Sequence, residues 1–86
     1  MSPRYAVVFG YAIFFFASDR NEPPHVHISR PATPNSSSKF WIHGETAELV
    51  HNNAQIPEHE LRRIEKYLNR NAESILNYWN EFFGQS

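Results

Sequence analysis

The sequence predicts an α+β domain: a small antiparallel sheet of about four strands in the first half, with one or two C-terminal helices packed on one face. Two patterns support this prediction. Residues that favour β-structure concentrate before residue 50, whereas apolar residues recur at helical spacing after residue 57. A chain of 86 residues is sufficient for one domain. We therefore expect a single domain over residues 1–86, strand-rich over 5–50 and helical over 57–83.

The first two strand candidates cover residues 5–9 and 11–17, and Gly10 between them indicates a bulge or a turn. The second segment is apolar at every position. Alternate residues of a strand point to opposite faces, so both faces of this strand require cover. One layer of helices covers only one face. We therefore expect the other face to meet a second copy of the chain or a small cognate protein partner.

Three further strands are expected over residues 25–28, 39–43 and 46–50. The first of them alternates polar and apolar residues, which is typical of a half-buried strand. Pro- and Ser-rich loops are predicted over residues 18–24 and 30–38.

The helical half begins near Pro57, a residue that suits the first turn of a helix. Glu58 and Glu60 follow, where the helix dipole favours negative charge. Low helix propensity over residues 69–71 favours a break into two helices, and Gly84 is a natural stop. The predicted core stripe comprises Leu61, Ile64, Leu68, Ala72, Ile75, Trp79 and Phe82.

Composition excludes several classes of protein. The chain has no cysteine, so neither a disulfide nor a thiolate metal site can form. The apolar stretch over residues 5–17 is shorter than the roughly 20 residues that span a bilayer. We expect a cytoplasmic protein without membrane contact. The formal net charge of −1 argues against general nucleic-acid binding, although it permits local contact with RNA.

The sharpest candidate for chemistry lies around His25 and His27. Histidines two positions apart on a strand share one face, which suits either acid–base catalysis or two metal ligands. Asp19 is the third candidate catalytic residue. The pattern requires no cofactor, but His25 and His27 could hold a divalent metal together with His43 or a carboxylate. The candidate binding residues around them are Arg20, Asn21, Glu22, Pro23, Pro24 and Arg30.

Simpler interpretations stay open beside these. The two histidines could be surface residues or could serve only to bond a neighbouring carboxylate. Arg62, Arg63, Lys66 and Arg70 fall on one side of the predicted helix and form either a solvated face or a ridge that contacts phosphates. Neither a Ser–His–Asp order nor a phosphate-binding glycine loop is present in the sequence.

Four segments carry a recognisable pattern: FFFASDRNEPPHVHI over residues 14–28, KFWI over 39–42, ELRRI over 60–64 and NYWNEFFG over 77–84. In this order they resemble a small bacterial family of unknown function with an N-x-H-x-P-P-H-x-H-V loop and strand. Pro23, Pro24, His25 and His27 match that motif. Asp19 stands for its Asn, Asn21 replaces its loop histidine, and His43 stands where the family often has an acidic residue.

The resemblance implies a short cytoplasmic protein that is often encoded beside a second small protein in a toxin–antitoxin-like pair. Two hypotheses follow. In the first, the chain is an RNA-directed effector that acts through the His25/His27 region. In the second, it is a non-enzymatic antitoxin-like or regulatory interaction module whose histidines are structural. Whether the chain is an enzyme is left open by the sequence.

Overall fold

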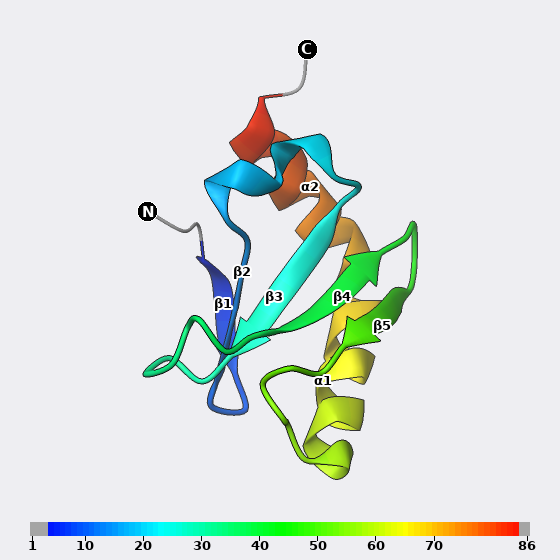
Figure 1. Cartoon of the computed structure of the whole chain (residues 1–86). Helices are drawn as coiled ribbons and strands as arrows, with labels where there is room; N and C mark the ends of the chain where they lie inside the picture. Colours follow the sequence, from blue (N-terminus) through cyan, green and yellow to red (C-terminus); the bar gives the residue numbers. More distant parts are fainter. Residues whose placement is uncertain (1–3, 85–86) are drawn as a thin grey trace.

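The computed structural model describes residues 4–84, so the outermost residues of the predicted 1–86 domain lie outside the described part. The elements follow in the order β1 (Arg4–Val8), β2 (Tyr11–Phe14), the 3-10 helix η1 (Ala17–Asn21), β3 (His25–Ser29), β4 (Ser38–Ile42), β5 (Ala47–His51), α1 (Glu58–Arg70) and α2 (Ala72–Phe83) (Figure 1).

The sheet contains five strands, so the prediction of about four strands is wrong. All neighbouring strands pair antiparallel in the order β1-β2-β3-β4-β5. Each of the five strand candidates joins this one sheet, and β1 does so because Phe9 and Gly10 both adopt positive φ, 54° and 82°. Two such residues make a tight hairpin turn, which folds β1 back onto β2 with Val8 opposite Tyr11.

The second strand is shorter than the predicted segment over residues 11–17. It ends at Phe14, and the chain turns into η1. The backbone N–H of Phe16 donates to Oδ2 of Asp19 at 2.7 Å. This side-chain acceptor satisfies an N–H that would otherwise lack a strand partner, and thereby favours the turn. The turn brings Asp19 close to β3.

The helical half divides at Asn71, within the predicted break. Asn71 has φ −113° and ψ 14°, and its Nδ2 donates to the carbonyl of Tyr67 at 2.8 Å. Such local bonding by Asn competes with the helical pattern and interrupts it. Both helices lie on one side of the sheet, and the C-terminal end of α2 approaches η1 (Figure 1). A hydrogen bond of 3.0 Å from Arg20 to the carbonyl of Phe83 joins these two segments.

The core lies between the helices and one face of the sheet. It contains most of the predicted stripe, packed on β2, β3 and β4: Ile64, Leu68, Ala72, Ile75 and Trp79 against Tyr11, Ile13, Phe15, Val26, Ile28, Phe40 and Ile42. The end of the stripe differs from the prediction. Phe82 is 44% exposed, whereas Phe83 packs on Trp79 with ring centres 4.4 Å apart.

On the opposite face of the sheet, the part formed by β2 is covered by the chain itself. Ala12 and Phe14 are buried, and they line a small pocket together with Pro31 and Pro34 of the loop before β4. The ring of Phe16 contacts Phe14 at a centre-to-centre distance of 5.3 Å. The expectation that this face meets a second copy or a small partner protein stays a prediction. Neither helix of residues 4–84 is long and apolar enough to cross a membrane.

Candidate functional site

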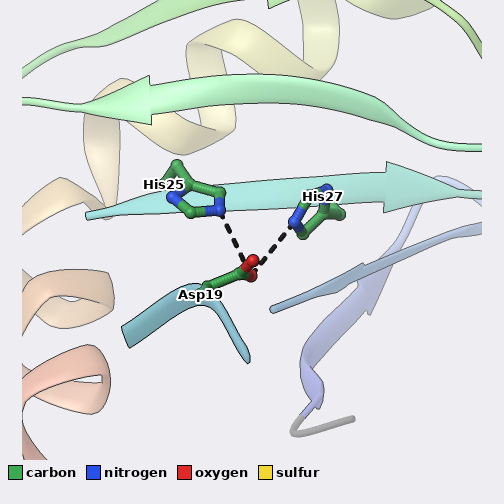
Figure 2. Close-up of side chains that lie close together, drawn as sticks. All are labelled: Asp19, His25 and His27. Atoms are coloured by element: carbon green, nitrogen blue, oxygen red, sulfur yellow. Dashed lines mark hydrogen bonds and ion pairs between the residues drawn. The ribbon is translucent and has the colours of Figure 1, made fainter. Parts of the chain in front are cut away.

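Asp19, His25 and His27 meet at one point between η1 and β3 (Figure 2). The two histidines occupy alternate positions of β3 and therefore project from the same face of the sheet. The turn of η1 places Asp19 over that face. Pro23 and Pro24 fix the backbone that leads from η1 into β3, because their rings restrict φ.

The close contacts among these three side chains all involve one oxygen atom. Oδ2 of Asp19 lies 3.2 Å from Nε2 of His25 and 3.1 Å from Nε2 of His27. The same oxygen accepts the bond from the backbone N–H of Phe16. Three nitrogen atoms therefore surround a single carboxylate oxygen.

Aromatic rings enclose the cluster. The exposed fraction of the side chain is 0% for His25, 9% for Asp19 and 12% for His27. The ring of Trp79 lies 5.3 Å from that of His25, and the ring of Phe16 lies 4.7 Å from that of His27. A polymer such as RNA therefore has no direct access to His25 and only slight access to His27.

The hydrogen position on His25 follows from its other neighbour. Nδ1 of His25 lies 2.9 Å from the carbonyl oxygen of Pro23, and a carbonyl can only accept. Nδ1 consequently carries a hydrogen atom. Nε2 of the same ring points at Asp19, is buried, and forms no hydrogen bond among the described residues. A buried ring nitrogen thus lies beside a carboxylate oxygen without a hydrogen bond between them.

Two pKa values are shifted around the cluster, that of His27 inside it and that of Glu22 at its edge. Burial lowers the pKa of His27, and the nearby carboxylate of Asp19 opposes this effect only in part. At the rim, Lys39 donates to Oε1 of Glu22 at 2.8 Å, which holds the pKa of Glu22 below its usual range.

Of the other predicted site residues, Pro23 contacts His25 through its carbonyl and Glu22 lies 3.9 Å from Nδ1 of His25, whereas the rest lie apart from the cluster. Arg20 binds the end of α2, and Arg30 donates to the carbonyl of Ala54 at 2.9 Å. His43 pairs with Glu48 at 2.9 Å. These two residues line a shallow pocket of about 250 Å³ with Pro23, Pro24, Trp41 and Ile42. Asn21 is exposed in η1. The structure thus unites Asp19, His25 and His27 and leaves His43 outside.

A second pocket, of about 160 Å³, lies where α1 meets the β1–β2 turn. Its lining residues are Phe9, Arg63, Lys66, Tyr67 and Arg70. The four helical residues share one face of α1 because they are spaced by three and four positions. None of the three cations forms an ion pair with another residue of the described chain. Burial, with a smaller effect of Tyr5, raises the pKa of Tyr67, so this phenol is neutral at physiological pH.

Phe9 in this second pocket was not predicted as a functional residue. It is 45% exposed and holds φ at 54°, a conformation that is unfavourable for a bulky side chain by about 1 kcal/mol or more. Turns of this kind prefer Asn-Gly. A bulky Phe before Gly10 in a turn is therefore the feature of the sequence that could have indicated a functional role for Phe9. Only the structure places Phe9 beside the cations of α1.

The fold and these two sites define a class: an α+β domain with an enclosed histidine–aspartate cluster and a separate basic aromatic pocket. The chain belongs to the DUF4160 family, a domain of unknown function whose family model matches residues 10–80. No curated protein and no solved structure matched the chain.

Proposed function

We propose that this chain is the RNA-contacting member of a toxin–antitoxin-like protein pair, and that it binds RNA through the pocket of Phe9, Arg63, Lys66, Tyr67 and Arg70. One observation carries the proposal: an exposed aromatic ring held in an unfavourable backbone conformation lies beside three cations that have no ion-pair partner among the described residues.

The charge of the pocket suits the phosphates of a nucleic acid. The neighbouring Arg62 is paired with Glu58 at 2.9 Å, whereas Arg63, Lys66 and Arg70 are available to an anion. Each phosphate contact releases condensed counterions, so binding weakens as salt rises. With three contacts to a single strand, we expect the logarithm of affinity to fall with the logarithm of salt concentration with a slope of about −2.

The aromatic part of the pocket suits an unstacked base. The guanidinium carbon of Arg63 lies 4.1 Å from the centre of the Phe9 ring, and Tyr67 meets the same ring edge-on at 6.4 Å. Proteins that bind single strands combine such rings with a cationic surface, and each stacked base contributes about 1–3 kcal/mol.

The His25/His27 region is less suited to direct contact with RNA. His25 is fully enclosed, and Nε2 of His27 is already bonded to Asp19. A general base has to reach its proton donor within hydrogen-bond distance, and the aromatic cover restricts that approach. We therefore assign RNA contact to the α1 pocket and a binding rather than a catalytic role to the chain.

Fluorescence anisotropy with a labelled 12-nucleotide single-stranded RNA tests this proposal. The Lys66→Ala, Arg70→Ala variant should bind at least tenfold more weakly than the wild type and show a smaller salt slope. Arg62→Ala is the matched control, because it removes a cation of the same helix that already has a partner. Equal affinity of all three proteins, or no binding by the wild type at low salt, would contradict the proposal.

A second candidate function, a protein-interaction module, is favoured by the outer edge of the sheet. Among residues 4–84, β5 is an edge strand of the sheet, and its Leu49 and Val50 are each 41% exposed. An open edge can accept a strand from another protein. Expression of the chain alone and together with the product of its neighbouring gene separates the two functions. Growth arrest that the neighbour relieves favours an RNA-directed effector, whereas harmless expression with co-purification favours the module.

A further inference from the structure

We propose that Asp19, His25 and His27 bind one divalent transition-metal ion, with zinc as the expected ion, between η1 and β3. One oxygen and two imidazole nitrogens form a donor set that zinc and other first-row ions accept. These three donor atoms all lie within 4.8 Å of one another. The proposal is independent of RNA binding at the α1 pocket.

The first argument is the buried Nε2 atom of His25. Nδ1 of this ring bonds the carbonyl of Pro23, whereas Nε2 lies 3.2 Å from Oδ2 of Asp19 and has no hydrogen-bond partner among the described residues. A buried polar atom without a partner is costly. A cation between these two atoms converts the unfavourable contact into two coordinate bonds.

The second argument is the number of groups around Oδ2. Phe16 N–H and both histidines approach this one oxygen. A carboxylate oxygen has two lone pairs, and the hydrogen bonds with Phe16 N–H and with Nε2 of His27 already use both of them, so none remains for Nε2 of His25. With a metal ion bound, Oδ2 would keep the hydrogen bond from Phe16 and use its other lone pair for the metal.

The third argument is distance. Zinc binds nitrogen and oxygen at about 2.0–2.1 Å, which places neighbouring donors of a tetrahedral site about 3.3 Å apart. The two nitrogen–oxygen distances are 3.2 and 3.1 Å. These two distances match a tetrahedral site, whereas the third pair of donors is only within 4.8 Å and closes as the ion binds. Three protein donors leave one position for a further ligand.

The surroundings of His25 also match a metal ligand. A ligating histidine usually donates its other ring nitrogen to a carbonyl or carboxylate, which orients the ring. Pro23 supplies that carbonyl at 2.9 Å. His27 differs from His25 in this respect, because its Nδ1 is buried and has no hydrogen-bond partner among the described residues.

A metal ion at this position would join η1 to β3. Loss of the ion should therefore loosen η1, which Arg20 connects to the end of α2.

The test uses the full chain, which is first treated with EDTA and then freed of EDTA. Zn²⁺ is titrated while the melting temperature and the tryptophan fluorescence are followed, because Trp41 and Trp79 lie 5.6 and 5.3 Å from the ring of His25. Saturating Zn²⁺ should bind one ion per chain and raise Tm by at least about 5 °C.

The ligand variants are Asp19→Asn and His27→Gln, each of which should weaken Zn²⁺ binding at least tenfold. The matched control is His43→Gln, His59→Gln, which removes two histidines whose side chains are 55% and 73% exposed and should bind Zn²⁺ as the wild type does. Circular dichroism in EDTA establishes that each variant is folded.

Co²⁺ provides a measurement that does not depend on any variant, because the wild type should show the intense visible absorption of a tetrahedral Co²⁺ site. The proposal is overturned if the wild type shows neither a Zn²⁺-dependent Tm nor a Co²⁺ band. It is equally overturned if the two ligand variants bind Zn²⁺ as tightly as the wild type, or if the exposed-histidine control abolishes binding.

Discussion

Arg63 places its guanidinium carbon 4.1 Å from the centre of the Phe9 ring, and so holds an exposed aromatic side chain against α1. The β1–β2 turn by itself does not favour this residue, because Phe9 has φ of 54°. The contact therefore offsets part of a local conformational cost. It also keeps a flat ring accessible beside Lys66 and Arg70.

Replacement of Phe9 by Asn separates binding from stability. Asn tolerates positive φ and is preferred before Gly in such turns, so Phe9→Asn should not lower the free energy of unfolding. The loss of the stacking surface should weaken RNA binding at least about tenfold. Urea denaturation and RNA anisotropy on the same preparation check both effects.

Phe82→Asn is the control for this change, because Phe82 is a similarly exposed aromatic residue on α2. It should leave RNA affinity unchanged. If Phe9→Asn destabilises the fold while RNA affinity is preserved, Phe9 is a structural residue and the proposed pocket lacks its aromatic component.

Trp79 should dominate the stability of the helical layer. It is 6% exposed and packs on Phe15 with ring centres 5.0 Å apart. Trp79→Ala should lower the free energy of unfolding by about 3–5 kcal/mol, because it removes a large buried ring and leaves a cavity. A domain of this size has little stability to spare, so the variant should be largely unfolded at 37 °C. Circular dichroism melting curves measure the loss.

Phe82→Ala tests whether that effect comes from burial rather than from aromatic character, since Phe82 is 44% exposed. The expected loss is below about 1 kcal/mol. If both variants lose a similar free energy of unfolding, burial does not explain the effect of Trp79→Ala.

Tyr11 should make stability decrease in alkaline solution. Burial is the main cause that raises the pKa of Tyr11, and its hydroxyl donates to Oε1 of Glu60. The neutral phenol is therefore favoured in the folded state. This contribution is complete below the unfolded pKa of about 10 and is lost as pH rises through the higher folded pKa.

Tyr11→Phe should reduce that dependence and cost about 1 kcal/mol near neutral pH, because one hydrogen bond is lost. Urea denaturation at pH 8, 9, 10 and 11 measures both. Part of the slope should persist, since the pKa of Tyr67 is raised as well. An identical slope in wild type and variant would contradict the role of Tyr11.

Asp19 should control the order of η1 even when metal is absent. Its carboxylate accepts the N–H of Phe16 and lies against both histidines. In EDTA, Asp19→Ala should lower the free energy of unfolding by about 3 kcal/mol, because buried donors lose a charged acceptor. Amide hydrogen exchange of Phe16 and of residues 17–22 should accelerate more than exchange in β4. Uniform acceleration across the sheet would indicate global rather than local destabilisation.

The arrangement of the elements could be predicted from local patterns, with specific exceptions. Alternation of residues predicted β3, and helical spacing predicted the buried Ile64, Leu68 and Trp79. The strand count was wrong although all five strands fall on segments with β-favouring residues, because local pattern does not show that the Phe9-Gly10 hairpin pairs β1 with β2 within the same sheet. The predicted strand over residues 11–17 was too long, because the side chain of Asp19 competes for the backbone at Phe16.

The sequence by itself determined which residues could meet at the candidate site, since the positions of His25 and His27 on a strand place both imidazoles on one face. Only the tertiary structure decided their environment. The fold of η1 brings Asp19 to both rings, and Phe16 and Trp79 enclose them. The tertiary structure likewise placed Phe9 beside Arg63, more than 50 residues along the chain. Burial and long-range contact depend on the packing of distant segments, which local periodicity does not specify.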